Sequence, residues 1–306
     1  MNKRRGIILA ISGASFWGTS GVAVQYLYQH TSITSAWLVA MRLIGAGLLL
    51  VAWAHNKYHG EITTLLHDKR SWPELLPFSI IGVGGSQFTY FTAVQYSNAS
   101  TATVIQFLSP LFIIDYMLLI KRIFPKRIEL ISVFVAIIGT VILVTDGHLD
   151  HLSLSPQALI WGLLAAFCTA MEVVIPSKLM KHYRTIPLTG VSMLFCGICL
   201  SPVFMLTSWP TLTLFEWCLI GYIIIGGTLC AYLLFLASIR YIPVSTTGML
   251  GAFEPLVATI LTVVLLGTPM SIFSLIGGSL IIIATIIQSL PIEKIIKAHK
   301  KTSWPK

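Results

Sequence analysis

The sequence predicts an all-α polytopic membrane protein with ten transmembrane helices, arranged as two inverted five-helix repeats. The evidence is the composition, the placement of basic residues and an internal repeat. Of the 306 residues, 56% are hydrophobic and only 10% are charged, and the mean hydropathy is +0.85. Soluble domains carry about 25% charged residues, so this composition indicates a chain that lies mostly in lipid.

Ten apolar segments are each long enough to cross a bilayer, which requires roughly 20 residues. Their backbone groups cannot remain unpaired in lipid, so we expect each segment to be a helix. The predicted spans are 7–27, 34–54, 75–96, 100–120, 128–145, 158–177, 187–207, 217–239, 244–266 and 271–290.

The basic residues predict the orientation of these spans. If the spans alternate in direction, all but one of the 20 Lys and Arg residues fall on the side of the N-terminus, and Arg42 is the exception. Cytoplasmic loops carry such an excess, so both termini are predicted to be cytoplasmic, in a bacterial plasma membrane. The net charge of +9 is then explained by the orientation of the chain in the lipid bilayer, because the basic residues lie on the side of the anionic leaflet. We therefore expect no nucleic-acid partner.

The chain also repeats itself. A shift of 145 residues places 96–142 over 241–287 without a gap, and the "PL" at 110–111 meets the "PL" at 255–256. Five spans per repeat is an odd number, so the second repeat enters the membrane the other way round. Inverted repeats are typical of secondary transporters, whose substrate site lies near the midplane between them. We expect repeats at 1–149 and 150–291 and a basic cytoplasmic tail at 292–306.

Four stretches carry a family resemblance: "GASFWGTSGVA", "SAWLVAMRLIGAGLLL", "STATVIQFLSPLF" and "FEPLVATILTVVLLG". In this order and spacing the chain resembles the EamA-type family of the drug/metabolite transporter superfamily. The chain departs from the family pattern at the ends of the fourth and ninth predicted spans. Family members often have an "LGE"-like stretch there, whereas this chain has "IKRIF" and "LLGTP". The resemblance implies a carrier that works by alternating access without ATP hydrolysis, often exporting amino acids or related compounds.

Only four ionisable side chains lie well inside the spans: Arg42, Asp115, Glu172 and Glu254. A charge at the bilayer centre costs roughly 2.5–3.5 kcal/mol on insertion scales, so each of them requires an explanation. Glu254 and Arg42 lie deepest. They could form a structural ion pair, Arg42 could bind backbone carbonyls, or both could serve a substrate or a coupling proton. Asp115 and Glu172 lie nearer the cytoplasmic ends and are, with Glu254, the coupling candidates.

Pro110 and Pro255 occupy matching positions in the two repeats. Each removes a backbone donor and frees the carbonyl four residues earlier, on Gln106 and Gly251. Lipid does not satisfy such groups, so we expect a pair of kinks along a central cavity; a bend needed only for packing is the alternative. Nearby polar and aromatic residues complete the substrate-binding candidates, which are Glu254, Arg42, Trp17, Gln87, Tyr90, Gln106, Ser109 and Tyr232.

Other functional classes fit less well. All eight histidines lie outside the spans, and there is no phosphate loop, HExxH motif or nucleophile elbow, so we expect no enzyme, metal or cofactor. The favoured interpretation is a secondary active transporter that exports amino acids or related small metabolites. Uptake of a small cation such as a quaternary amine, held by Glu254 and aromatic faces, is the alternative, as is a channel-like facilitator. Substrate, direction and coupling ion stay open, as does the choice between monomer and homodimer.

Overall fold

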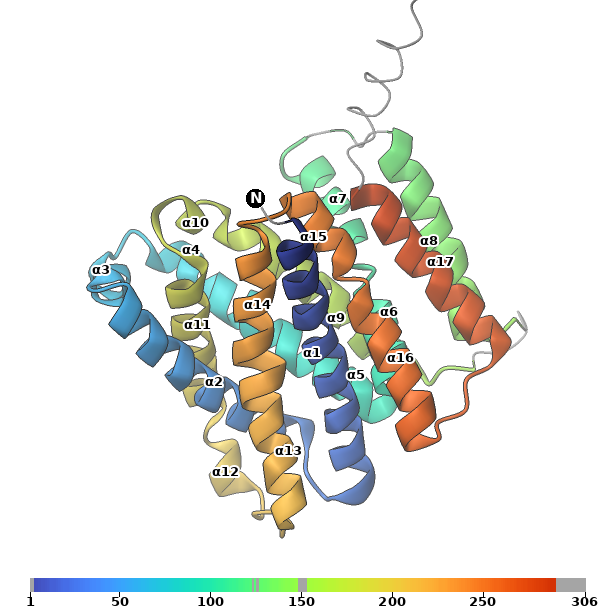
Figure 1. Cartoon of the computed structure of the whole chain (residues 1–306), viewed down its shortest axis with the longest axis horizontal. Coiled ribbons are helices and arrows are strands. Elements are labelled where there is room, and N and C mark those ends of the chain that lie inside the picture. Colours follow the sequence, from blue (N-terminus) through green and yellow to red (C-terminus); the bar gives the residue numbers. More distant parts are fainter. Residues whose placement is uncertain (1–2, 123, 125–126, 148–152, 290–306) are drawn as a thin grey trace, which may run out of the picture.

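The computed structural model describes residues 3–122, 124, 127–147 and 153–289, and all its regular elements are helical (Figure 1). The predicted basic tail at 292–306 lies outside the described residues. Within them, eight helical segments are long and apolar enough to span a membrane. These are α1 (Lys3–His30), α2 (Ser35–Lys57), α6 and α7 (Ala99–Leu119), α8 (Arg127–Thr145), α9 and η2 (Pro156–Ser177), α11 and α12 (Thr185–Leu206), α13 to α14 (Leu214–Ser238), and most of α15 with α16 (Thr246–Leu266). The prediction of an all-helical polytopic membrane protein is confirmed.

Two of the ten predicted spans are not among these eight. The third consists of α4 (Trp72–Pro77), the π-helix η1 (Phe78–Gly84) and α5 (Gly85–Tyr96). The sequence of this third span is rich in Ser, Thr and Gly, and this composition lowers its hydropathy. Several of its hydroxyl groups are buried inside the protein. The tenth is α17 (Ile272–Ser289), which lies at the end of the described residues and has an apolar helical stretch over Ile272–Ile287.

Several of the predicted spans, numbered here in the order of the ten-span prediction, are made of more than one helical element. The fourth span divides into α6 (Ala99–Gln106) and α7 (Ser109–Leu119), and the ninth into α15 (Val244–Leu250) and α16 (Phe253–Leu266). The eighth passes from α13 (Leu214–Ile224) through the π-helix η3 (Ile225–Cys230) to α14 (Ala231–Ser238). The sixth comprises α9 (Pro156–Val174) and η2 (Ile175–Ser177), and the seventh α11 (Thr185–Leu200) and α12 (Val203–Leu206). Two short helices, α3 (Glu61–His67) and α10 (Leu179–His182), complete the described elements.

Helices that start at the end of the bundle opposite the N-terminus have side-chain caps. Thr34, Asn98, Ser155 and Thr213 each accept a hydrogen bond from a backbone N–H in the first turn of α2, α6, α9 and α13. Thr213 also forms a capping box with Glu216. The first turn of a helix leaves N–H groups unpaired, so these residues define where the four helices begin.

The opposite end of the bundle carries the N-terminus, α3, α4 and α10 (Figure 1). Lys57, Lys69 and Lys178 are exposed in the connections there. Arg184 forms an ion pair with Glu61 at 3.0 Å, and its guanidinium lies over the ring of Tyr58. We call this the basic end.

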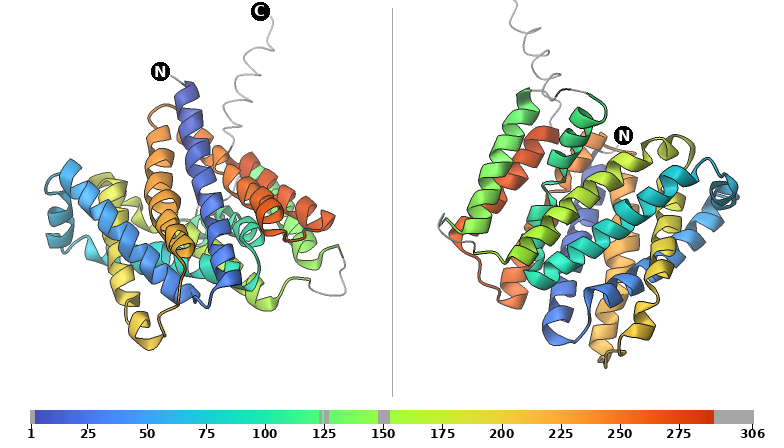
Figure 2. Two further views of the ribbon diagram at one scale, coloured as in Figure 1. Left: turned by 60° about the horizontal axis from the view of Figure 1, so that its bottom comes forward. Right: turned by 180° about the vertical axis from the view of Figure 1, so that it is seen from behind.

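The helices pack in a regular set of pairs. α2 packs on α11 and α8 on α17, α1 contacts α14 and α16, and α9 contacts α5, α6 and α7 (Figure 2). Glycines allow the backbones to approach closely. A Cβ on Gly47 would lie 2.6 Å from the backbone nitrogen of Leu194, and a Cβ on Gly197 would lie 2.7 Å from that of Ile44, so α2 and α11 meet through reciprocal contacts.

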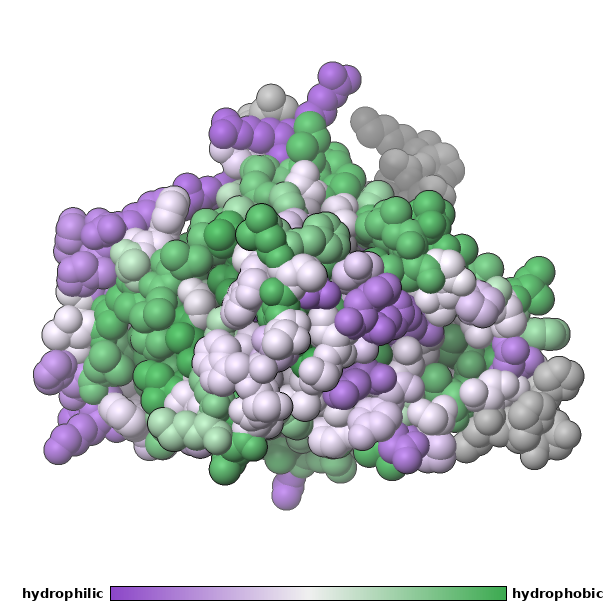
Figure 3. All heavy atoms as spheres, turned by 90° about the horizontal axis from the view of Figure 1, so that it is seen from below, coloured by the Kyte–Doolittle hydropathy of each residue, from purple (hydrophilic) through white to green (hydrophobic). Residues whose placement is uncertain are grey.

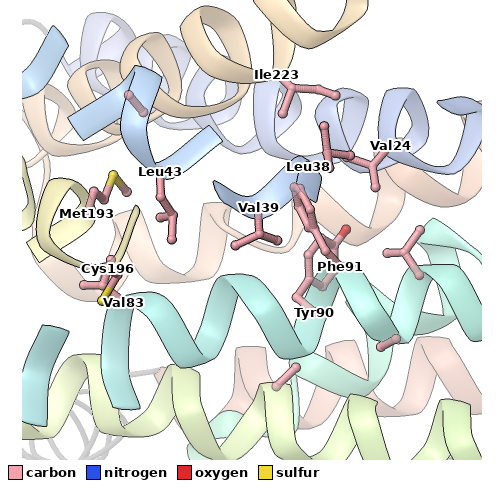
Figure 4. Close-up of a cluster of buried hydrophobic side chains, with 14 of the residues drawn as sticks. Val24, Leu38, Val39, Leu43, Val83, Tyr90, Phe91, Met193, Cys196 and Ile223 are labelled. Atoms are coloured by element: carbon pink, nitrogen blue, oxygen red, sulfur yellow. The ribbon is translucent and has the colours of Figure 1, made fainter. Parts of the chain in front are cut away.

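The main apolar core lies between α1, α2, α5, α11 and α13. Figure 4 shows Leu38 and Val39 of α2 facing Tyr90 and Phe91 of α5. Many large hydrophobic side chains are also exposed on the outside. Seen from the end opposite the basic end, broad hydrophobic areas flank a paler middle region (Figure 3). A surface of this kind is expected where the solvent is lipid.

Candidate functional site

A cavity of about 510 Å³ lies among the helices. Its walls come from α1, α2, α5, α9, α11, α14 and α17 and from the two places where the fourth and ninth spans are interrupted. All eight predicted substrate-binding residues line it: Trp17, Arg42, Gln87, Tyr90, Gln106, Ser109, Tyr232 and Glu254. Glu172 and Pro110 line it as well. Asp115, by contrast, is exposed on α7 and is not part of the wall, and Pro255 is buried in α16 directly after Glu254.

A turn breaks the regular α-helix in each of the two spans with matching prolines. α6 ends at Gln106 and α7 starts at Ser109; α15 ends at Leu250 and α16 starts at Phe253. The residues between them keep backbone dihedrals in the right-handed helical region, but the regular hydrogen-bond ladder of the helix is interrupted. At the second break the Gly251 carbonyl accepts a hydrogen bond from the Glu254 N–H at 2.9 Å.

The first break is stabilised from another span. The carbonyl of Phe107 accepts a hydrogen bond from the Thr285 hydroxyl of α17 at 3.2 Å. Broken helices occur at membrane depth only where they are buried in protein or line a cavity, and both breaks meet this condition.

Arg42 is 5% exposed and is held by the π-helix η3. Its Nε donates to the Thr228 hydroxyl at 2.8 Å, and its Nη2 donates to the Gly227 carbonyl at 3.2 Å. The guanidinium lies 4.9 Å from the ring centre of Phe91. Within the described residues no carboxylate lies within 4.0 Å of Arg42, so it is not ion-paired with Glu254. An arginine has five N–H donors, which leaves donors for a ligand.

Glu172 connects three helices. One carboxylate oxygen accepts from the Ser86 hydroxyl of α5 at 2.9 Å, and the other accepts from the Tyr232 hydroxyl of α14 at 3.0 Å. Gly82 allows this approach, because a Cβ there would lie 3.0 Å from the Glu172 Cα. The sequence placed Glu172 nearer the cytoplasmic end of its span, and the structure shows that it lies in the cavity wall.

Glu254 differs from Glu172 in having no partner. Its carboxylate lines the cavity at the start of α16 and, in the described part of the chain, forms no hydrogen bond or ion pair. Ser20 Oγ and Gln87 Oε1 also lack a hydrogen-bond partner among the described residues, but both atoms are buried and have almost no accessible surface. Trp17 packs edge to face on Tyr232, with ring centres 5.3 Å apart. The cavity therefore combines the carboxylate of Glu254 with an aromatic wall.

Several lining residues were not predicted from the sequence. Ser20 lies one helical turn after Trp17 on the same face of α1, and Thr169 lies one turn before Glu172 and accepts a hydrogen bond from the amide of Gln106 at 2.9 Å. Ser20 and Thr169 could both have been predicted, because each lies one helical turn from a predicted site residue and therefore on the same face of its helix. Others are threonines of α11 and α17; a single hydroxyl in an apolar run gives no signal, because it can bond to its own backbone.

At the end opposite the basic end, Gln25 joins the helices that surround the cavity. Gln25 lies in α1 and is 2% exposed. Its Oε1 accepts from the Ala99 N–H at 2.8 Å and from the Thr262 hydroxyl at 3.4 Å, and its Nε2 donates to the Thr268 hydroxyl at 3.0 Å. These bonds join α1, α6 and α16. Toward the basic end, the lining residue Met180 is 46% exposed.

Interrupted spans around a central cavity are typical of membrane transporters. The model of the EamA-like transporter family matches the chain twice, over residues 4–145 and 156–290, and the chain belongs to this family. The resemblance seen in the sequence is confirmed.

Curated relatives agree with this membership. An uncharacterized inner membrane transporter, YicL of Salmonella typhimurium, is 34% identical over 94% of this chain and 96% of its own length. An uncharacterized transporter, YwfM of Bacillus subtilis, is 27% identical over 92% and 93%. One solved crystal structure has the same fold, with a TM-score of 0.64 and 18% identity over 95% of this chain and 98% of its own.

Proposed function

We propose that the protein is a secondary active transporter that moves a small organic metabolite by alternating access around the central cavity, without catalysing a reaction. Export of an amino acid or a related compound is the favoured direction. The observation that carries this proposal is the cavity itself, bounded by the turns that interrupt two spans and lined by Glu254, whose carboxylate has no partner among the described residues. In transporters, substrate sites are typically formed where spanning helices are discontinuous.

The proposed architecture is ten spans in two inverted repeats, at 1–149 and 150–291. Three observations support it. The family model matches twice, with similar lengths. The third and eighth spans each contain a π-helix, Phe78–Gly84 and Ile225–Cys230. The packing is also reciprocal, since α1 contacts the eighth and ninth spans while α9 contacts the third and fourth.

The charges of the cavity favour a zwitterionic or cationic substrate. Two carboxylates and one guanidinium face it, and Glu172 is already bonded to Ser86 and Tyr232. Glu254 is therefore the free anionic group and Arg42 the cationic one with unused donors. Glu254 is also the candidate carrier of a coupling proton, because its carboxylate lines the cavity and has no partner in the described part of the chain.

The hydrogen bonds of Gln25, at the end of the bundle opposite the basic end, support alternating access as the mechanism. We assign the basic end to the cytoplasm of a bacterial plasma membrane, with both termini on that side. The cavity then faces the cytoplasm, and the Gln25 hydrogen bonds close the outer side. Release of a substrate to the outside requires these bonds to open while the basic end closes.

Counterflow in proteoliposomes tests the proposal. Vesicles are loaded with members of a metabolite panel of amino acids, amines, nucleosides and sugars, and entry of the labelled compound is measured. A carrier shows faster entry when the same compound is inside, whereas a channel shows no such stimulation. Glu254→Gln removes the free charge at nearly constant size, and we expect it to lower counterflow at least about tenfold while the protein still elutes as a single species. Normal counterflow in this variant would remove Glu254 from the mechanism.

A further inference from the structure

A second hollow, which we call the lateral groove, lies near the basic end between α2, α3, α4, η1 and α11 (Figure 1). Its volume is about 230 Å³, and it shares no residue with the central cavity. It reaches the outer surface of the bundle, because three of its lining side chains are substantially exposed: Leu66 (42%), Trp72 (37%) and Ile198 (59%). The groove is therefore open to the surrounding lipid rather than to the transport path.

The groove is apolar and runs along α11 into the membrane. Ser79 is its one hydroxyl residue, and that hydroxyl already donates to the Leu75 carbonyl at 2.8 Å and bonds with the Ser192 hydroxyl at 2.9 Å. Val191 and Ile198 of α11 line the groove seven residues apart, which is roughly 10 Å along the helix axis. A slot without free polar groups at this depth fits a hydrocarbon chain and offers nothing to a polar ligand.

The mouth of the groove carries basic residues. Leu66 and Trp72 both line the groove, and the indole Nε1 of Trp72 donates to the Leu66 carbonyl at 3.1 Å. This bond closes the loop between α3 and α4, which presents the exposed side chains of Lys69 and Arg70 at the edge of the groove, while exposed Lys57 ends α2 nearby. Tryptophan beside lysine and arginine is typical of the boundary between lipid and water.

Acidic residues of the same region do not neutralise these three cations. Glu61 is paired with Arg184. The Asp68 carboxylate faces its own loop, where it accepts hydrogen bonds from the Arg70 N–H and from two hydroxyl groups. No carboxylate in the described part of the chain forms an ion pair with the three basic residues, so their donors are available to an anion.

We infer that the lateral groove is a binding site for an anionic phospholipid of the leaflet at the basic end, with one acyl chain along α11 and the phosphate of the headgroup at Lys69 and Arg70. The two parts of the site match the two parts of the lipid, an apolar slot and a cationic rim. Basic pockets between membrane helices bind anionic headgroups in this way. A zwitterionic lipid supplies the chain without the net charge. The site is separate from the central cavity, so the inference does not depend on what is transported.

Trp72 makes the groove directly testable, because bromine atoms on an acyl chain quench tryptophan emission at short range. The full-length protein is reconstituted into vesicles of equal parts phosphatidylglycerol and phosphatidylcholine, in which only one of the two lipids is brominated. The chain has eight tryptophans, so the Trp72 signal is taken as the difference between the wild type and Trp72→Phe. We expect brominated phosphatidylglycerol to quench Trp72 more strongly, with a relative binding constant at least about fivefold higher, as expected for one basic residue near an anionic headgroup.

Charge variants locate the headgroup. Lys69→Gln with Arg70→Gln removes the cationic rim and should make the two brominated lipids quench Trp72 equally. The matched control is Lys3→Gln with Arg4→Gln, which removes two exposed basic residues at the same end of the bundle, on α1. This control should keep the preference for phosphatidylglycerol, because a general attraction of the basic end for anionic lipid is not what the groove measures.

A filling variant locates the acyl chain. Val51→Phe enlarges a lining side chain and should reduce the quenching of Trp72 by both lipids. Leu48→Phe is its control, because Leu48 is 53% exposed on the same helix and does not line the groove.

Three results overturn the site. Equal quenching by the two brominated lipids in the wild type would show ordinary surrounding lipid. A preference that survives the loss of Lys69 and Arg70 would remove the headgroup from the cationic rim. Absence of Trp72 quenching by either lipid would mean that something other than lipid, such as a second copy of the chain, covers the groove.

Discussion

The contact between α1 and the π-helix η3 allows a sharp test by Gly227→Ala. With the backbone unchanged, the new Cβ would lie 2.2 Å from Ser20 Oγ and 2.3 Å from Ser20 Cβ. Both distances are more than 1 Å shorter than an ordinary contact of about 3.5 Å. Rotation of the Ser20 hydroxyl cannot relieve the clash with Cβ, so α1 and η3 must move apart.

The cost has two sources. Overpacking a close contact costs about 1–3 kcal/mol. Displacement of η3 also weakens the bond from Arg42 to the Gly227 carbonyl, and a hydrogen bond to a charged group contributes about 1.5–3 kcal/mol. Together the two costs come to roughly 2.5–6 kcal/mol if the hydrogen bond is lost completely, partly offset by about 1 kcal/mol because alanine is a better helix former than glycine.

The assay is thermal unfolding of the detergent-solubilised protein, followed by size-exclusion chromatography after heating. Gly221→Ala is the matched control, because it lies in the same span and nothing lies within 4 Å of its added Cβ. This control should be as stable as the wild type or more stable. The double variant Ser20→Gly with Gly227→Ala should recover much of the loss. Wild-type stability of Gly227→Ala alone would refute the close approach of α1 and η3.

Two further predictions concern polar groups. Arg42→Lys keeps the charge, but one ammonium cannot reproduce the bonds of the guanidinium to both η3 groups, so we expect at least tenfold slower counterflow in proteoliposomes, with Arg42→Gln slower still. Asp68 lies outside the spans, and the backbone N–H of Arg70, followed by the hydroxyl of Ser71, lowers the pKa of its carboxyl group. A lowered folded-state pKa contributes stability above the ordinary value of about 3.9, and this contribution is lost as the pH falls through the lowered value. Asp68→Asn should therefore melt below the wild type at pH 7 and approach it in acid; an equal gap at both pH values would contradict this assignment.

The fold class and the location of the cavity could be predicted from the sequence because lipid imposes strong constraints. Charges are costly in the membrane, so Arg42, Glu172 and Glu254 were conspicuous, and all three line the cavity. Asp115 has the same chemistry but is exposed on α7, and nothing in a single sequence separates the two cases. Depth along a helix was predictable, whereas the direction in which the side chain points was not.

The partners of these charges could not be predicted. Arg42 binds Thr228 and Gly227, which are more than 180 residues away, through carbonyl and hydroxyl groups exposed by a π-helix. A π-helical turn has no clear sequence signature. The turns beside the two prolines could not be predicted for a similar reason, because a bond such as that from Thr285 to the Phe107 carbonyl depends on a distant helix.

Alternating access around one cavity is the central claim, and labelling a cavity position from each side of the membrane tests it most directly. Ser109→Cys is introduced into a chain whose five native cysteines are replaced, and a membrane-impermeant thiol reagent is applied to either face. We predict labelling from the side of the basic loops. Adding Gln25→Ala removes three closing hydrogen bonds, about 1 kcal/mol each, and should increase labelling from the opposite side while reducing it from the first. Equal labelling from both sides, unchanged by Gln25→Ala, would indicate a continuous pore and would contradict the account.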